Sequence, residues 1–175
     1  MFDLTKKESI VLDFLIEKPA KEFHIREIAR KLMISSSTAK ISLDKLKKEK
    51  FITEKKIANL RIFKSNIENK LIQERKKTIN IDMITKSSIL EKIQNPTSIV
   101  LFGSFAKGTN NEDSDIDILI ITNNKKPIDL LDIKGHELQI IQLTPLEWKE
   151  KVKKDKPFYH EVITTGIPLI GELPL

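Results

Sequence analysis

The spacing of apolar residues predicts three short helices within the first fifty residues. The first helix follows a capping box at residues 5–8 and ends before Pro19. The second covers residues 24–33, and the third starts at the serines of 35–37 and runs to about residue 50. Because only a very short turn separates the second helix from the third, the pattern is typical of a helix-turn-helix.

A β-hairpin is predicted after these helices, from two β-prone runs at 51–57 and 60–64. The combination resembles the winged helix-turn-helix domains of archaeal and bacterial transcription regulators over residues 1–66. Lys50 stands where those families usually have glycine, just before the wing. The resemblance implies DNA binding, although winged helices also serve as three-helix bundles that mediate protein contacts.

Hydroxyl and basic residues of this region are the candidates for DNA contact. The N-terminal end of the third helix would meet base edges, and phosphates need lysine or arginine. The base-reading candidates are Ser36, Ser37, Thr38 and Lys40. The phosphate candidates are Lys40, Lys55, Lys56, Arg61 and Lys64. No target sequence can be read from them.

Residues 67–95 are predicted to form a helical connector. Their apolar positions follow a helical but imperfect pattern, which predicts a break near Asn80 and an end at Asn95 and Pro96. These apolar positions must pack on a domain or on a second copy of the chain. A homodimer is therefore one of two expected outcomes.

The composition is that of a globular protein and limits the chemistry available to it. Of 175 residues, 39% are apolar and 32% charged, and no cysteine is present to form a disulfide, a nucleophile or a zinc site. Residues 1–95 carry 22 basic and 13 acidic residues, for a net charge of +9, whereas residues 96–175 carry 9 and 12, for −3. The basic half suits a polyanion such as nucleic acid, and the acidic half suits divalent cations held by oxygen ligands.

The chain shows no signal for a membrane. No apolar run approaches the roughly 20 residues that a membrane-spanning helix needs. Residues 1–20 carry acids and lysines where a signal peptide would be apolar. The expected location is cytoplasmic.

A phosphate-binding arrangement is predicted where a short apolar strand at 98–102 ends. Gly103 would let a phosphate approach the backbone, and Ser104 supplies a hydroxyl at the start of a short helix. A second strand follows at 116–121, with Asp115 and Asp117 at its start. The two carboxylates would point to the same side, roughly 6 to 7 Å apart, which suits Mg²⁺ bridging nucleotide phosphates. Alternatively, one aspartate caps a turn and the other is solvated.

The spacing of these two signals resembles a known family. The pair Gly103 and Ser104, ten residues and then Asp115-Ile116-Asp117 match the signature of nucleotidyltransferases similar to DNA polymerase beta, in particular the minimal nucleotidyltransferase group. Gly108 and Ser114 match as well, and the resemblance covers residues 96–175. It implies that Gly103 and Ser104 hold a triphosphate and that the aspartates bind Mg²⁺. Lys107 and Ser114 complete the expected nucleotide-binding set.

The family also uses a third carboxylate on a later strand, which completes the metal site and can activate the attacking hydroxyl. The corresponding strand covers residues 136–143, and counting back from Thr144 and Pro145 places Gln139 at the acidic position. Either Glu137, one alternate position earlier, serves as metal ligand and base, or the site binds nucleotide without chemistry.

Together these features predict an α+β chain in three parts: a winged helix-turn-helix at 1–66, a helical connector at 67–95 and a nucleotidyltransferase fold with a small mixed sheet at 96–175. The expected reaction is Mg²⁺-dependent transfer of AMP from ATP to a hydroxyl of a protein or nucleic acid. One alternative is a transcription regulator that only senses nucleotide. Another is an autoregulating antitoxin that modifies a partner toxin, since minimal nucleotidyltransferases often act in that way.

Overall fold

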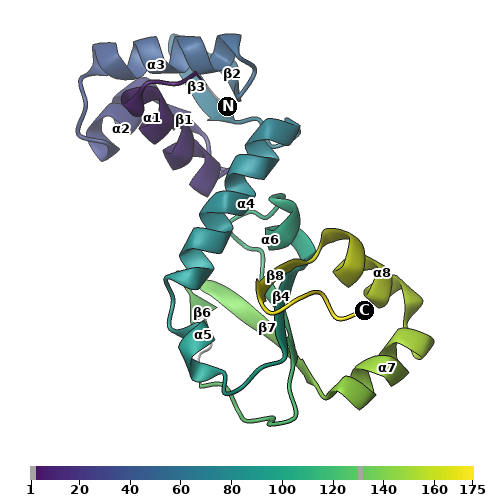
Figure 1. Cartoon of the computed structure of the whole chain (residues 1–175). Coiled ribbons are helices and arrows are strands. Elements are labelled where there is room, and N and C mark those ends of the chain that lie inside the picture. The colour runs from purple at the N-terminus through teal and green to yellow at the C-terminus, as the bar shows by residue number, and fades with distance from the viewer. Residues whose placement is uncertain (1–2, 130–131) are drawn as a thin grey trace. The chain divides into compact units, whose positions relative to one another are not determined.

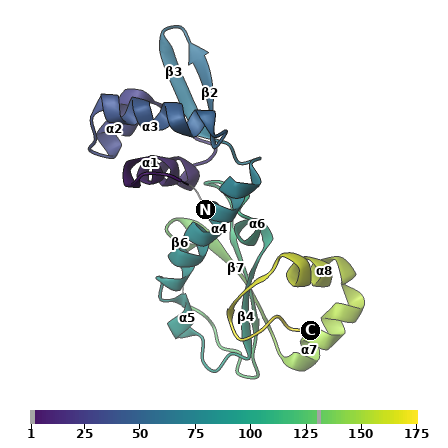
Figure 2. The same cartoon turned by 45° about the horizontal axis from the view of Figure 1, so that its top comes forward.

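The computed structural model describes residues 3–129 and 132–175, which divide into two compact units at 1–76 and 77–175. The boundary lies inside one long helix, α4 (Lys70–Thr85), within the segment predicted to be the connector. Figures 1 and 2 show each unit's helices and strands. No helix of the described residues is both long and apolar enough to cross a membrane.

The first unit has the winged helix-turn-helix topology that the sequence predicts. It contains α1 (Lys6–Glu17), β1 (Phe23–His24), α2 (Ile25–Lys31), α3 (Ser36–Lys48), β2 (Ile52–Ile57) and β3 (Leu60–Ser65). The strands form an antiparallel sheet in the order β1-β3-β2, so β2 and β3 are the predicted wing hairpin. The short strand β1 was not predicted, because two residues give no periodicity to detect.

Local capping determines where these helices begin. Thr5 and Glu8 form a reciprocal capping box at the start of α1, as predicted. The Nδ1 atom of His24 accepts a hydrogen bond from the Glu27 amide at 3.1 Å and begins α2, and Ser35 caps α3 in the same way through Thr38. Lys50 adopts a φ of 60°, the left-handed conformation that glycine adopts most readily.

The predicted break near Asn80 is wrong, because α4 runs unbroken to Thr85. Asn80 is buried, and its side-chain amide donates to the Phe105 carbonyl and to the Asn110 side chain, both at 2.9 Å. The side chain is thus satisfied by tertiary partners and does not compete with the helix backbone. Asn80, at which a helix break was predicted, therefore lies inside the helix and makes tertiary hydrogen bonds.

The second unit is built on a five-stranded mixed sheet. After α5 (Ile89–Lys92) come β4 (Ser98–Phe102), α6 (Gly103–Lys107), β5 (Ile116–Ile121), β6 (Asp132–Ile133), β7 (His136–Leu143), α7 (Pro145–Lys154), α8 (Lys156–Thr165) and β8 (Ile167–Ile170). The strand order is β6-β7-β5-β4-β8, with β5 and β7 parallel and the other pairs antiparallel. Strands β6 and β7 form a hairpin that turns at Lys134 and Gly135.

Each face of this sheet packs against helices. Alternate residues of β4 and β5, such as Ile99 and Ile118, join Ile84 and Ile89 of α4 and α5 in one core. The opposite residues of the same strands pack with Trp148 of α7 and Val162 of α8. Figure 1 shows these helices on the two sides of the sheet. The central strands are therefore held firmly from both faces, and the ends of β4 and β5 are fixed in place.

Candidate active site

Two neighbouring strands bring the glycine turn and the aspartates together. Phe102, the last residue of β4, pairs with Asp117 of β5 in antiparallel register. Gly103 follows at once with a φ of +69°, and a Cβ atom added to it would lie 2.1 Å from Oδ2 of Asp117. The Asp117 carboxylate thus lies directly over the turn that begins α6. The sequence placed both features, and the register of β4 against β5 brings them into contact.

Asp117 is half-buried among charged neighbours. Burial raises the pKa of Asp117, the nearby Asp115 and Glu161 raise it further, and Lys107 acts in the opposite direction. Asp115 lies just before β5 and is exposed. Negative charges held close together at the edge of a core are stabilised by a cation. The arrangement therefore favours a positively charged ligand beside Asp117.

The third acidic position of the sequence pattern is occupied by an amide. In the parallel pairing of β5 with β7, Asp117 lies opposite Gln139, and Ile116 lies opposite Leu138. Glu137 is one alternate position earlier on the same face and is exposed. The strand register therefore places Gln139 beside Asp117, at the position that counting back from Thr144 and Pro145 also indicates. The role of Glu137 as a third ligand stays a prediction.

The residues present fit Mg²⁺ only if a nucleotide shares it. Throughout 3–129 and 132–175, no group of three or more histidine, cysteine or acidic side chains is arranged to hold a metal ion. Mg²⁺ is commonly held by one or two carboxylates together with substrate phosphates. Asp115 and Asp117 supply that number of ligands, so they suit a jointly held ion and not a metal site made by protein alone.

Two further candidates have partners of their own. Lys107 forms an ion pair with Glu161 of α8 at 2.6 Å. The Ser114 hydroxyl accepts from the Asn111 amide at 2.9 Å and donates to its side chain at 3.0 Å, so it shapes the loop ahead of Asp115. Ser104 is partly buried beside Gly103. Sequence reasoning missed Glu161, because no motif marks it and it lies 54 residues after Lys107.

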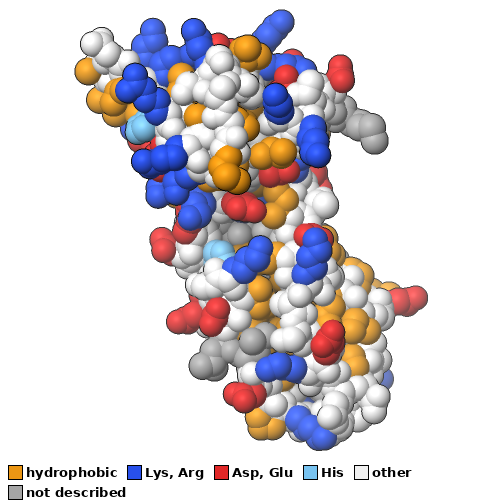
Figure 3. All heavy atoms as spheres, turned by 90° about the vertical axis from the view of Figure 1, so that its left-hand side faces the viewer, with side chains coloured by type: hydrophobic (Ala, Val, Ile, Leu, Met, Phe, Trp, Pro, Cys, Tyr) orange, Lys and Arg blue, Asp and Glu red, His pale blue; other side chains and the backbone are white. Residues whose placement is uncertain are grey.

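The first unit presents its predicted DNA contacts unevenly. Ser36, Ser37 and Lys40 are exposed at the start of α3, whereas Thr38 is partly buried and its hydroxyl accepts from that of Ser35 at 2.9 Å. Ile41, next to Lys40, is 67% exposed and was not predicted. Figure 3 shows lysine and arginine side chains gathered over one face of this unit.

The basic residues of the wing differ in their partners. Arg61 pairs with Glu54 and with Asp44, each at 2.6 Å, and Lys55 pairs with Glu22 at the same distance. Lys40, Lys56 and Lys64 are exposed and have no ion-pair partner within the described part of the chain. Arg61 therefore holds the wing against α3, and these three lysines are the more available for phosphate.

Part of the second half of the chain is similar to a known family. Residues 83–166 match the family model described as a nucleotidyltransferase domain. No curated protein matches the chain. Similar solved structures include MepR, a transcription regulator of the Staphylococcus aureus multidrug efflux pump MepA, at 18% identity and a TM-score of 0.41 over 54% of this chain and 69% of that one.

Two other solved structures are similar to the same degree. Lactococcus lactis ZitR is 18% identical, with a TM-score of 0.40 over 54% of this chain and 65% of that one. A complex of S. aureus MepR with DNA is 17% identical, with a TM-score of 0.40 over 51% and 73%. The winged-helix assignment itself rests on the element order and strand pairing of the first unit.

Proposed function

We propose that this chain transfers AMP from ATP to a hydroxyl of a protein or nucleic acid, a proposal supported by the match of residues 83–166 to the nucleotidyltransferase domain. The observation that carries the proposal is the Asp117 carboxylate lying over Gly103, with Asp115 beside it. This arrangement brings negative ligands for a cation to the same turn that would hold the phosphates. A further carboxylate for the cation is Glu137 in this proposal.

The chain's own groups would divide the work as follows. Gly103 lets the triphosphate approach the backbone, and Ser104, Lys107 and Ser114 surround it. Bound Mg²⁺ supplies charge neutralisation on the phosphates and on the leaving pyrophosphate. The acceptor oxygen forms a bond to the α-phosphorus, the bond from that phosphorus to the bridging oxygen breaks, and pyrophosphate leaves. The hydroxyl proton passes to Glu137 or to water.

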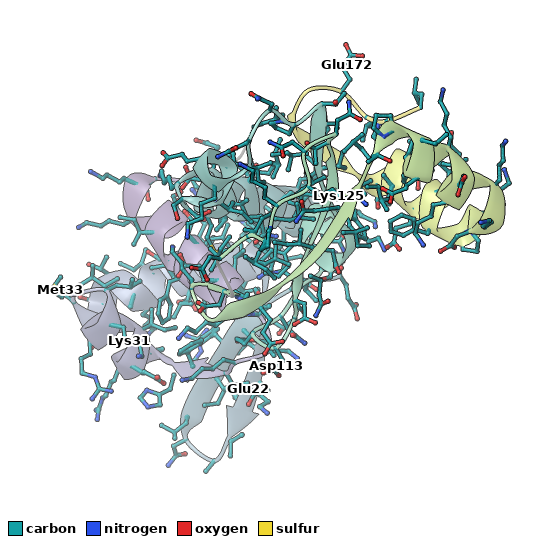
Figure 4. The ribbon with its side chains drawn as sticks, turned by 90° about the horizontal axis from the view of Figure 1, so that it is seen from below. Glu22, Lys31, Met33, Asp113, Lys125 and Glu172 are labelled. Carbon is teal, nitrogen blue, oxygen red and sulfur yellow. The ribbon has the colours of Figure 1, made fainter. Side chains whose placement is uncertain are left out.

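The test is incubation with α-labelled ATP and Mg²⁺, with total RNA or lysate as acceptor. Wild type should transfer label, and Asp115→Asn and Asp117→Asn should not. Asp113→Asn is the matched control, because Asp113 is an exposed aspartate in the loop before the site (Figure 4). Loss of transfer in Glu137→Gln would assign Glu137 as the third carboxylate of the site. Label transfer by Asp117→Asn equal to that of wild type would overturn the proposal.

A second candidate is nucleotide sensing without turnover, and Gln139 beside Asp117 favours it. An amide carries no charge and accepts no proton, so this position cannot serve as base or as anionic ligand. Wild type would then bind ATP and form no product. Gln139→Glu is the informative variant, because gain of label transfer in it alone would show that the missing carboxylate limits the wild-type site.

We further propose that the first unit binds duplex DNA through α3 and the wing. Ser36, Ser37, Thr38 and Lys40 would meet the bases, while Lys55, Lys56, Arg61 and Lys64 would lie near phosphates. The test uses a mixed pool of short duplexes at several salt concentrations. Each lysine that contacts phosphate should contribute about 1 to the slope of log affinity against log salt.

The variants for that test follow from the ion pairs. Lys40→Ala and Lys56→Ala should weaken binding and lower the slope, because neither lysine has an ion-pair partner in the described chain. Lys153→Ala, an exposed lysine of α7, is the control. Unchanged affinity in both test variants would favour the alternative, a winged helix that contacts protein.

A further inference from the structure

An ion pair links α6, the short helix that begins at Gly103, to α8. Lys107 is the last residue of α6, three positions after Ser104, and its Nζ lies 2.6 Å from Oε1 of Glu161 on α8. The side chains are 41% and 38% exposed, so water and solutes can reach both. The pair is therefore accessible and joins elements that are far apart in the sequence.

Both members of the pair act on the candidate site. Lys107 ends the five-residue helix that begins at Gly103, and the Asp117 carboxylate lies over Gly103. Glu161 reaches the same helix through its ion pair with Lys107. The ammonium group of Lys107 is therefore on the same short helix as the turn under Asp117. A nucleotide triphosphate is a polyanion, and Lys107 is the cation that it would meet there. Glu161 and the phosphates therefore compete for the same ammonium group.

We propose that Glu161 is a specificity-determining residue that lowers the affinity for polyphosphate ligands, because its carboxylate competes with their β- and γ-phosphates for Lys107. This inference rests on the nucleotide binding proposed above. A ligand with β- and γ-phosphates offers several negative oxygens and can displace one carboxylate. A monophosphate has fewer negative oxygens. Its single phosphate would be held at the Gly103 turn and would not compete with Glu161 for Lys107. Exchange of the partner of Lys107 thus sets the affinity for nucleoside di- and triphosphates and leaves that for monophosphates unchanged.

The variant Glu161→Gln frees Lys107 without changing the shape of the side chain. Partly exposed ion pairs are weak, so ATP should bind roughly two- to fivefold more tightly to this variant than to wild type. AMP should bind equally to both. A residue that only supported the fold would not increase affinity when changed, and the sign of the effect separates the two roles.

Equilibrium dialysis with labelled ATP and labelled AMP in Mg²⁺ tests the inference. The proteins are wild type, Glu161→Gln, Lys107→Met and the double variant. Glu150→Gln is the control, since Glu150 of α7 lies 3.9 Å from Lys154 in an exposed pair. Lys107→Met should weaken ATP binding, and the effect of Glu161→Gln should largely disappear when Lys107 is replaced.

The outcomes distinguish this inference from the proposed function. Weaker ATP binding in Glu161→Gln would mean that the carboxylate helps to hold the nucleotide or its cation, and would overturn the inference. Unchanged ATP affinity, or equal tightening for AMP, would overturn it as well while leaving the nucleotidyltransferase proposal intact. If wild type binds no ATP and transfers no label, both proposals fail together.

Discussion

Replacement of Gly103 by alanine is the sharpest test of the contact on which the site depends. Gly103 has a φ of +69°, which side chains other than hydrogen rarely adopt. Its absent Cβ would lie 2.1 Å from Oδ2, 2.9 Å from Cγ and 3.3 Å from Cβ of Asp117. The substitution therefore introduces two separate costs, one in the backbone and one against a side chain that is proposed to bind metal.

Each cost has an expected size. A non-glycine residue in the left-handed region loses about 1–2 kcal/mol. Overpacking by a methyl group adds about 1–3 kcal/mol, because carbon and oxygen normally stay more than 3 Å apart and the carboxylate must move by roughly 1 Å. Gly103→Ala should therefore destabilise the second unit by about 2–5 kcal/mol in total. ATP binding in Mg²⁺ should fall with it, since Asp117 is displaced.

The chain offers controls that separate the two costs. Gly135 has a φ of +86°, and an added Cβ would meet nothing within 4 Å, so Gly135→Ala measures the backbone cost alone. The double variant Gly103→Ala/Asp117→Ala removes the clashing side chain and should recover the packing cost. Trp148 is the single tryptophan and is buried beside the sheet, so denaturant unfolding followed by its fluorescence reports on this unit.

If Gly103→Ala is no less stable than Gly135→Ala, the Asp117 carboxylate does not lie over the turn. The same conclusion follows if the double variant shows no recovery beyond the sum of its single changes.

Three other predictions concern buried and charged groups. The raised pKa of Asp117 means that its ionised form is disfavoured in the folded protein. Asp117→Asn should therefore raise the denaturation midpoint at pH 7, and this gain should vanish at acid pH, where the carboxyl is neutral in both states. The same variant should lose label transfer. Hydrogen bonds from Arg61 and then from Lys47 lower the pKa of Glu54 to about 2. The interaction of Glu54 with Arg61 should therefore stabilise the first unit fully above pH 4.5, and this stabilisation should fall as the pH drops from 4.5 to 2. Glu54→Gln should accordingly cost about 1–3 kcal/mol at pH 7 and nothing near pH 2, as measured by circular dichroism. Asn80→Leu should destabilise the second unit by about 1–3 kcal/mol in Trp148 fluorescence, because the buried Asn110 side-chain oxygen loses its Asn80 donor and the Phe105 carbonyl keeps only the Gly108 amide.

Local patterns were sufficient to predict most of the elements. The capping box at residues 5–8, the apolar spacing of α1 to α3 and the β-prone runs of the wing all depend on residues close together in the sequence. The winged-helix topology and the strands of the second unit therefore agree with expectation. Strand β1 and the unbroken course of α4 through Asn80 were missed, because each depends on a partner distant in the sequence.

The candidate site shows the same division. The residues Gly103, Asp115 and Asp117 are marked by spacing along the chain, and the sequence alone singled them out. That Asp117 lies over Gly103 depends on the register of β4 against β5, and that Gln139 lies beside Asp117 depends on β5 against β7.

The sequence by itself singled out the candidate site residues at the start of α6 and at the start of β5, because their spacing along the chain is a local pattern. Only the tertiary structure decided that Lys107 forms an ion pair with Glu161 and that Arg61 forms ion pairs with Glu54 and Asp44. It also decided that the buried Asn80 side chain hydrogen-bonds to Asn110. These are charge and hydrogen-bond pairings between elements separated by many residues. No local pattern encodes such pairings, because they form only when packing of the apolar faces has brought the elements together.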